Sequence, residues 1–342
     1  MNRAVVLLDG REQLSQLLET AVVRITLAVL FLVPLIFPIA QTGHPFGELK
    51  VFVLHFGMLL VMVLWLWQKA LRMHRDRMFN RPIADFRPLE WVGRSPARWA
   101  IVALVVMWMA QIVSTALSPF PTLSVFGSDE HFPGGNLYDS FALLMVFLVV
   151  AFKFRTRARV EQIAWVLIGS ATIAAAYGIA QHFGWDLLGN RLGGRVLSSF
   201  GNTLNFSSYV AMAIPATIAI SLRKSSFDRK LVLLFGAALT LQMAGIWFSE
   251  SRGPLIGGAL AIGVLFFGLA LTRSSTELVR SGLIAGIGLF GAAVIVFIPS
   301  SGGSGGLAAT LSIGSEITNI GTDETSSDGG GGLSSRIQNW KN

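Results

Sequence analysis

Long apolar runs separated by short polar segments make up most of the chain. Nine of these runs are each near 20 residues, the length that a helix needs to cross the hydrocarbon core of a bilayer. Backbone groups in lipid must bond within their own segment, and the runs lack the alternating short strands of an outer-membrane barrel. The pattern therefore predicts an all-α polytopic membrane protein. The nine predicted helices cover about 21–40, 50–68, 99–117, 138–154, 161–182, 205–222, 231–248, 254–272 and 281–299.

The composition agrees with this fold class and removes some kinds of chemistry. Of the 342 residues, 53% are hydrophobic and 13% are charged, whereas a soluble domain carries about 25% charged residues. No cysteine is present, which excludes disulfides, thiolate metal sites and a cysteine nucleophile. We expect no metal and no cofactor. Three segments are predicted: a cytoplasmic N-terminal segment at 1–20, a transmembrane domain at 21–299, and the start of an external Gly/Ser-rich loop at 300–342.

Lysines and arginines divide unequally between the two sides of the predicted bundle. With a cytoplasmic N-terminus, 21 of them lie in inside segments and 6 in outside segments. This is the excess of positive charge that cytoplasmic loops carry. The net charge of +8 is thereby explained by topology and by contact with anionic membrane lipids. We expect no nucleic-acid partner.

The few basic residues of the external side include two that precede inward-running helices. Arg195 comes before the sixth predicted helix, and Arg252 comes directly before Gly253-Pro254, where the eighth begins. Proline is favoured at the first position of a helix. A helix N-terminus carries unpaired N–H groups and about half a positive charge. Two such ends and two guanidinium groups predict an anion site suited to phosphate.

Each of these residues also has a simpler interpretation. An interfacial arginine commonly extends to the lipid headgroups. Asn202 and Asn205 are natural caps for the sixth helix. Glu250 is close enough in sequence to pair with Arg252. The sequence is compatible both with these simpler roles and with an anion site.

Two stretches of the sequence are "GGRVLSSFGNTLNFSSYVAMAIP" and "FSESRGPLIGG". The first resembles an arginine followed by a G-T-F-x-N-P-N-like signature, and the second resembles a Ser-Arg-Gly motif at an external helix mouth. Both motifs are those of the bacterial O-antigen ligase and polymerase family. The sequence departs from the first motif where Thr203 and Leu204 stand in place of the expected proline. The matching positions are Arg195, Gly201, Asn202, Asn205, Ser251, Arg252 and Gly253.

A third stretch, "SSRIQNWKN", resembles an Arg-x-x-x-Trp element of the large external loop, with Arg336 and Trp340. The resemblance covers about 193–342. In the family this loop continues to a histidine, the proposed catalytic base, and to more membrane helices. None of these follows in the sequence, so we expect the chain to be cut short within the loop and assign no base.

The resemblance implies a GT-C-like membrane glycosyltransferase of the bacterial inner membrane, with its site on the external, periplasmic face. Such an enzyme moves a glycan from an undecaprenyl-diphosphate carrier to a hydroxyl of an acceptor glycan, lipid or protein. The implied catalytic residues are Arg195, Arg252 and Arg336, which would stabilise the leaving diphosphate. The implied substrate-binding residues are Asn202, Asn205, Ser251 and Glu250.

Two other classes of protein remain open. A transporter of lipid-linked glycans places charged residues near the bilayer midplane, whereas the centres of these runs are almost free of charge. This difference favours chemistry at the membrane surface. A non-catalytic subunit or a fragment of a larger membrane assembly is the third class, and the missing loop histidine keeps it open.

Overall fold

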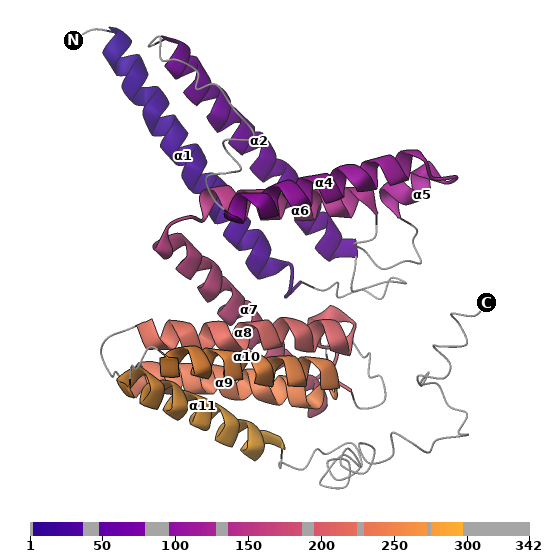
Figure 1. The fold of residues 1–342 in the computed structure, drawn as a ribbon, viewed down its shortest axis with the longest axis vertical. Helices are drawn as coiled ribbons and strands as arrows, with labels where there is room; N and C mark the ends of the chain where they lie inside the picture. The colour runs from indigo at the N-terminus through magenta and orange to yellow at the C-terminus, as the bar shows by residue number, and fades with distance from the viewer. Residues whose placement is uncertain are drawn as a thin grey trace. The chain divides into compact units, whose positions relative to one another are not determined.

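The computed structural model describes residues 3–36, 48–78, 96–127, 136–186, 195–223, 229–271 and 275–296. Over these residues the chain is all-helical and contains no sheet strand, which confirms the predicted fold class (Figure 1). The residues after 296 form a second unit, which lies outside the described part. The helices are α1 (Arg3–Leu32), α2 (Glu48–Met78), α4 (Pro96–Ala116), α5 (Pro121–Phe126), α6 (Leu137–Lys153), α7 (Arg157–His182), the 3-10 turn η1 (Ser198–Phe200), α8 (Thr203–Arg223), α9 (Arg229–Phe248), α10 (Arg252–Leu271) and α11 (Ser275–Val296).

Among the described residues, six helices are long and apolar enough to cross a membrane. They are α1, α2, α4, α7, α8 and α9. Helices α10 and α11 contain shorter apolar stretches, at Arg252–Gly268 and Ser281–Ala292. The protein is therefore a helical membrane protein by the length and composition of its helices.

Two predicted boundaries differ from the structure. The first apolar run was placed at 21–40, but α1 ends at Leu32, because Pro34 follows and the residue before a proline is disfavoured in helical conformation. Its buried stripe reaches back to Ser15 and Leu18, so the helix begins well before residue 21. The connection between the predicted helices at 99–117 and 138–154 contains the short helix α5, which has proline at its start.

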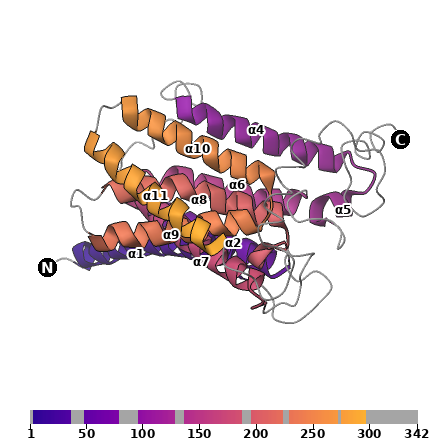
Figure 2. The ribbon, with the colours of Figure 1, turned by 90° about the horizontal axis from the view of Figure 1, so that it is seen from below.

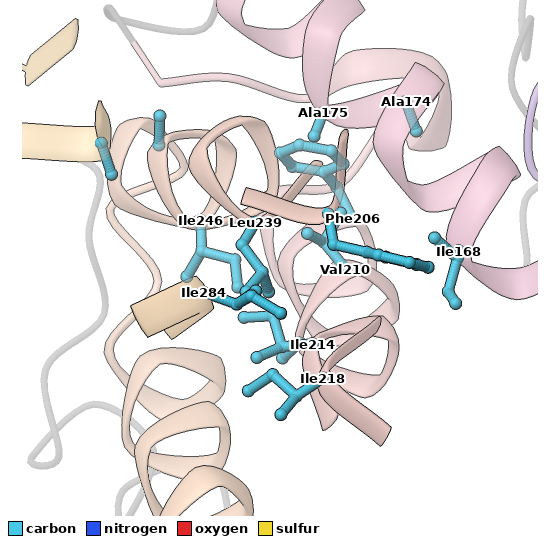
Figure 3. Packing of buried hydrophobic residues seen from close by; sticks show 14 of the residues in the cluster. Ile168, Ala174, Ala175, Phe206, Val210, Ile214, Ile218, Leu239, Ile246 and Ile284 are labelled. Carbon is cyan, nitrogen blue, oxygen red and sulfur yellow. The ribbon is translucent and has the colours of Figure 1, made fainter. Parts of the chain in front are cut away.

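Two apolar clusters hold the described helices together. Side chains of α1, α2 and α6 form one cluster, centred on Val22, Met58 and Val149. Side chains of α7, α8, α9 and α11 form the other, centred on Phe206 and Leu239 (Figure 3). In lipid, close packing of this kind takes the place of the hydrophobic force that drives association in water.

Helices α8, α9, α10 and α11 lie side by side (Figure 2). On α11, a side chain at Gly288 would place its Cβ 2.6 Å from the Cβ of Leu239 on α9. The small residue therefore lets the two backbones approach closely. On α10, Gly258 faces Ala211 of α8, seven residues into α10 and nine into α8. The Val196 N–H, just before α8, donates to the carbonyl oxygen of Phe248 at the end of α9, and α10 begins at Arg252. Helices α8 and α10 therefore have their N-termini at the same end.

Candidate functional site

The candidate site is built on the segment Arg195–Gly201, which enters α8. Its Val196 N–H donates to the carbonyl oxygen of Phe248, the last residue of α9, at 3.2 Å. From Val196 to Ser199 the side chains are no more than 4% exposed. Parts of the chain about 50 residues apart are thereby joined at the N-terminal ends of α8 and α10.

Polar contacts from α7 and from the residues just after α1 fix the buried serines of this segment. The backbone N–H of Ser198 donates to Oε1 of Gln181 on α7 at 2.7 Å, and the Ser198 hydroxyl donates to the carbonyl of Ala174 at 2.7 Å. The Ser199 hydroxyl donates to the carbonyl of Pro34, just after α1, at 2.5 Å. Buried polar groups need such partners, and here each partner also fixes the path of the backbone.

Lys50, near the start of α2, completes the support. Its Nζ donates to the carbonyl of Ser199 at 2.6 Å and lies 4.5 Å from the ring centre of Phe200. A cation over an aromatic face is attracted by the ring quadrupole. The charge count had placed Lys50 among the six external basic residues, and that was the one sequence signal for its role.

Two residues of the site adopt backbone conformations that are rare for side-chain-bearing residues. Ser198 has a φ of 51° and Glu250 a φ of 54°, and these are the two non-glycine residues with positive φ in the described part of the chain. Such conformations cost of order 1–3 kcal/mol each and persist where the surroundings impose them. Both lie at this site, which indicates that its geometry is held by its neighbours.

Arg195 and Glu250, two of the predicted site residues, form an ion pair. The Nε of Arg195 lies 3.2 Å from Oε2 of Glu250, and its Nη2 donates to the Glu250 carbonyl at 3.5 Å. The two side chains are 53% and 49% exposed. The pair is therefore open to water, and an exposed pair of this kind contributes only about 0–1 kcal/mol.

Ser251 and Arg252 follow Glu250 directly. Arg252 is the first residue of α10 and is exposed. Because consecutive Cα atoms are about 3.8 Å apart, the Cα of Arg252 lies within about 7.6 Å of the Cα of Glu250. The backbone of Arg252 therefore lies close to that of Glu250, the residue whose carboxylate contacts Arg195. The backbone N–H of Ser251 donates to the hydroxyl of Ser249 at 3.3 Å, which shapes the turn between α9 and α10.

Asn202 caps α8, which is the simpler of the two roles that the sequence left open for it. Its Oδ1 accepts from the backbone N–H of Leu204 at 2.8 Å and from that of Asn205 at 3.4 Å. Asn205 lies in the first turn of α8 with an exposed side chain. Asn202 thus satisfies free donors of the helix end, while the amide of Asn205 faces the surface.

His182 ends α7 next to the site. Its ring stacks on that of Phe248 with centroids 3.9 Å apart, and the Phe248 carbonyl accepts the N–H of Val196. Among the described residues, no group of three or more His, Asp and Glu side chains is placed to hold a metal ion. Arg336 and Trp340, and the loop predicted at 300–342, lie outside the described residues.

Chemically, the site presents one guanidinium on a rigid buried segment and a second at the start of a parallel helix. The first is neutralised by a carboxylate that water also reaches. Comparison of the chain with protein-family models, with characterised proteins and with solved structures gave no match.

Proposed function

We propose that the chain is a membrane glycosyltransferase of the O-antigen ligase and polymerase type. It moves a glycan from an undecaprenyl-diphosphate carrier to a hydroxyl of an acceptor glycan, lipid or protein. One observation carries the proposal: the two stretches that resemble the family motifs meet through the ion pair between Arg195 and Glu250 and the bond from Val196 to Phe248.

In this reaction the acceptor oxygen bonds to the anomeric carbon while the bond from that carbon to the diphosphate oxygen breaks. The acceptor hydroxyl gives up its proton to water, and undecaprenyl diphosphate leaves with the bonding electrons. Negative charge thus develops on the diphosphate. Arg195 and Arg252, beside two helix N-termini, would stabilise it without reorganising. Removal of one such donor costs on the order of 3 kcal/mol in other enzymes.

Glu250 acts as the counter-ion of Arg195 when no donor is bound. Two like charges repel at short range, so the arginines need an anion near them. Exchange of the Glu250 carboxylate for a diphosphate fits the exposure of both side chains. Asn205 and Ser251 would then contact the sugar or phosphate oxygens, and Arg336 would approach from the external loop.

The proposal includes nine membrane-spanning helices in a GT-C-like arrangement. The three beyond the six long apolar helices are α6, α10 and α11, since each of the nine predicted apolar runs overlaps one helix. The positive-inside pattern supports a cytoplasmic N-terminus and a site on the opposite, external face, which the proposal assigns to a bacterial inner membrane. Lys50 and Arg72 both lie in α2, 22 residues apart, which is about 33 Å along a helix. This matches the thickness of the hydrocarbon core.

A transfer assay tests the proposed activity. Purified protein is incubated with undecaprenyl-diphosphate-linked glycan and an acceptor, and the transferred glycan is measured by mass spectrometry. We expect Arg252→Lys to lose at least tenfold in rate, because an ammonium keeps the charge but not the bidentate fork. Arg157→Lys, at the opposite end of the bundle, serves as the control and should retain the wild-type rate. A wild-type protein that leaves the donor intact with every acceptor class would contradict the proposal.

A further inference from the structure

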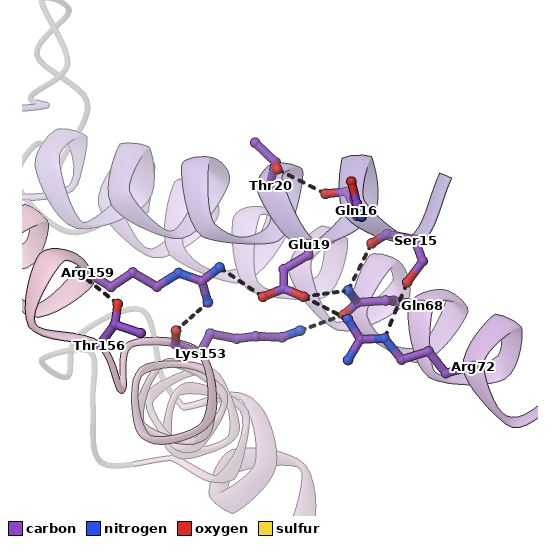
Figure 4. A network of polar contacts seen from close by, with 9 residues as sticks. All are labelled: Ser15, Gln16, Glu19, Thr20, Gln68, Arg72, Lys153, Thr156 and Arg159. Carbon is purple, nitrogen blue, oxygen red and sulfur yellow. Dashed lines mark hydrogen bonds and ion pairs between the residues drawn. The ribbon is translucent and has the colours of Figure 1, made fainter. Parts of the chain in front are cut away.

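A second charged cluster lies at the other end of the helices, where α1, α2, α6 and α7 meet (Figure 4). Glu19 of α1 accepts from Nη2 of Arg72 at 2.7 Å through Oε2, and from Nη2 of Arg159 at 2.8 Å through Oε1. Gln68 donates to Glu19 at 3.2 Å and accepts from Nζ of Lys153 at 2.5 Å. Side chains from four helices are therefore held in one network.

A pocket of about 290 Å³ opens beside this network. Four of its lining residues are cationic, and Glu19 is the one carboxylate among the lining residues. Both oxygens of Glu19 are already engaged by arginines. The pocket is lined by Glu19, Trp65, Lys69, Arg72, Phe152, Lys153 and Arg155.

The most buried of these cations, Lys153, is 8% exposed. Its Nζ contacts the neutral amide of Gln68 and lies 5.9 Å from the ring centre of Trp65. Burial of a charge is costly unless an opposite charge compensates it. Glu19 attracts the Lys153 ammonium but is already paired with two arginines, so an anion in the pocket would add to the compensation.

The aromatic side of the pocket suits a lipid. The rings of Trp65 and Phe152 lie with centroids 5.9 Å apart, and the guanidinium of Arg155 lies 5.1 Å from the Phe152 ring centre. Tryptophan and other aromatic rings favour the boundary between headgroups and acyl chains. The cations that line the pocket suit a phosphate group, and the aromatic rings that line it suit an apolar chain attached to that phosphate.

We infer that this pocket binds a phosphate group, carried by the headgroup of an anionic phospholipid. Basic pockets between membrane helices on the cytoplasmic side are a known place for such headgroups. The volume suits a headgroup phosphate rather than a glycan chain, since pockets for drug-sized molecules begin at about 300 Å³. The pocket lies about 33 Å along α2 from Lys50, so it is separate from the site at Arg195. It does not depend on the proposed transfer activity.

The test uses the purified full chain in a neutral detergent, with lipid binding measured by native mass spectrometry. Titration with phosphatidylglycerol, with phosphatidylcholine and with inorganic phosphate as a competitor separates the sources of the phosphate. The test variant is Lys69→Gln with Arg155→Gln, since both side chains are exposed and the Glu19 network stays intact. Arg157→Gln is the control, an exposed arginine in the same basic stretch that does not line the pocket.

We expect the wild type and the Arg157→Gln control to bind phosphatidylglycerol more tightly than phosphatidylcholine. The double variant should bind phosphatidylglycerol at least tenfold more weakly, a loss of about 1.4 kcal/mol or more, because it lacks two of the four cations that line the pocket. Competition by millimolar inorganic phosphate would support the pocket and identify free phosphate as a ligand. Equal affinity of wild type and double variant, or equal affinity for the two lipids, would overturn the inference.

Discussion

Replacement of Lys50 by methionine should release the segment that carries Arg195. In the structure Nζ of Lys50 donates to the buried carbonyl of Ser199 at 2.6 Å and lies over Phe200. A buried carbonyl left without its donor costs about 1–3 kcal/mol, and the lost cation–π contact adds about 0.5–1 kcal/mol. Methionine has a similar length and stays apolar, so we expect a net loss near 2 kcal/mol, localised to this segment.

Hydrogen exchange with mass spectrometry measures this loss directly. A loss of 2 kcal/mol raises the population of the open segment about 30-fold, and the exchange of the hydrogen-bonded Val196 and Ser198 amides rises with it. Lys69→Met is the matched control, because Lys69 is an exposed lysine of the same helix, and it should leave the segment protected. Unchanged protection in Lys50→Met would refute the idea that this lysine anchors the site.

Three further changes test the packing, the topology and the counter-ion. Gly288→Leu should lower the unfolding temperature by several degrees, because overpacking costs about 1–3 kcal/mol. Gly286→Leu, on the open face of α11, should leave the unfolding temperature unchanged. Equal effects of the two substitutions would show that the contact between Gly288 and Leu239 is absent. The chain has no cysteine, so Arg157→Cys and Asn205→Cys should label from opposite membrane faces with an impermeant reagent, and labelling from one face would refute the topology. Glu250→Gln should bind a lipid-diphosphate analogue about fivefold more tightly, because about 1 kcal/mol of repulsion between the carboxylate and the diphosphate is removed. The stability of the protein should change little. Weaker binding would mean that the Glu250 carboxylate itself contacts the bound analogue.

The sequence predicted the helices better than their ends. Apolar runs near 20 residues are a strong signal, and each of the nine overlaps a helix. The end of α1 was placed too late because hydropathy continues past Leu32, where Pro34 stops the helix. The helix α5 was missed because six residues carry too little periodicity to stand out from a loop.

The site was predicted in part. Arg195 and Glu250 were both named as site residues, but their pairing depends on how α7, α8 and α9 pack, which a motif does not contain. The contacts by which Lys50, Gln181 and Ser199 hold the segment after Arg195 in place were missed for the same reason. A single lysine at the start of a helix looks identical in sequence whether it meets lipid or a buried carbonyl.

The central claim is that Arg195 and Arg252 bind one diphosphate at the external end of the helices. Its most direct test is the affinity of a lipid-diphosphate analogue for the purified wild type, Arg195→Ala, Arg252→Ala and the control Arg157→Ala, measured by isothermal titration in a neutral detergent. Each site variant should bind at least tenfold more weakly, since a hydrogen bond to a charged group contributes about 1.5–3 kcal/mol, and the control should bind as the wild type does. Equal affinity in all four proteins would contradict the claim and leave the two arginines as anchors to lipid headgroups.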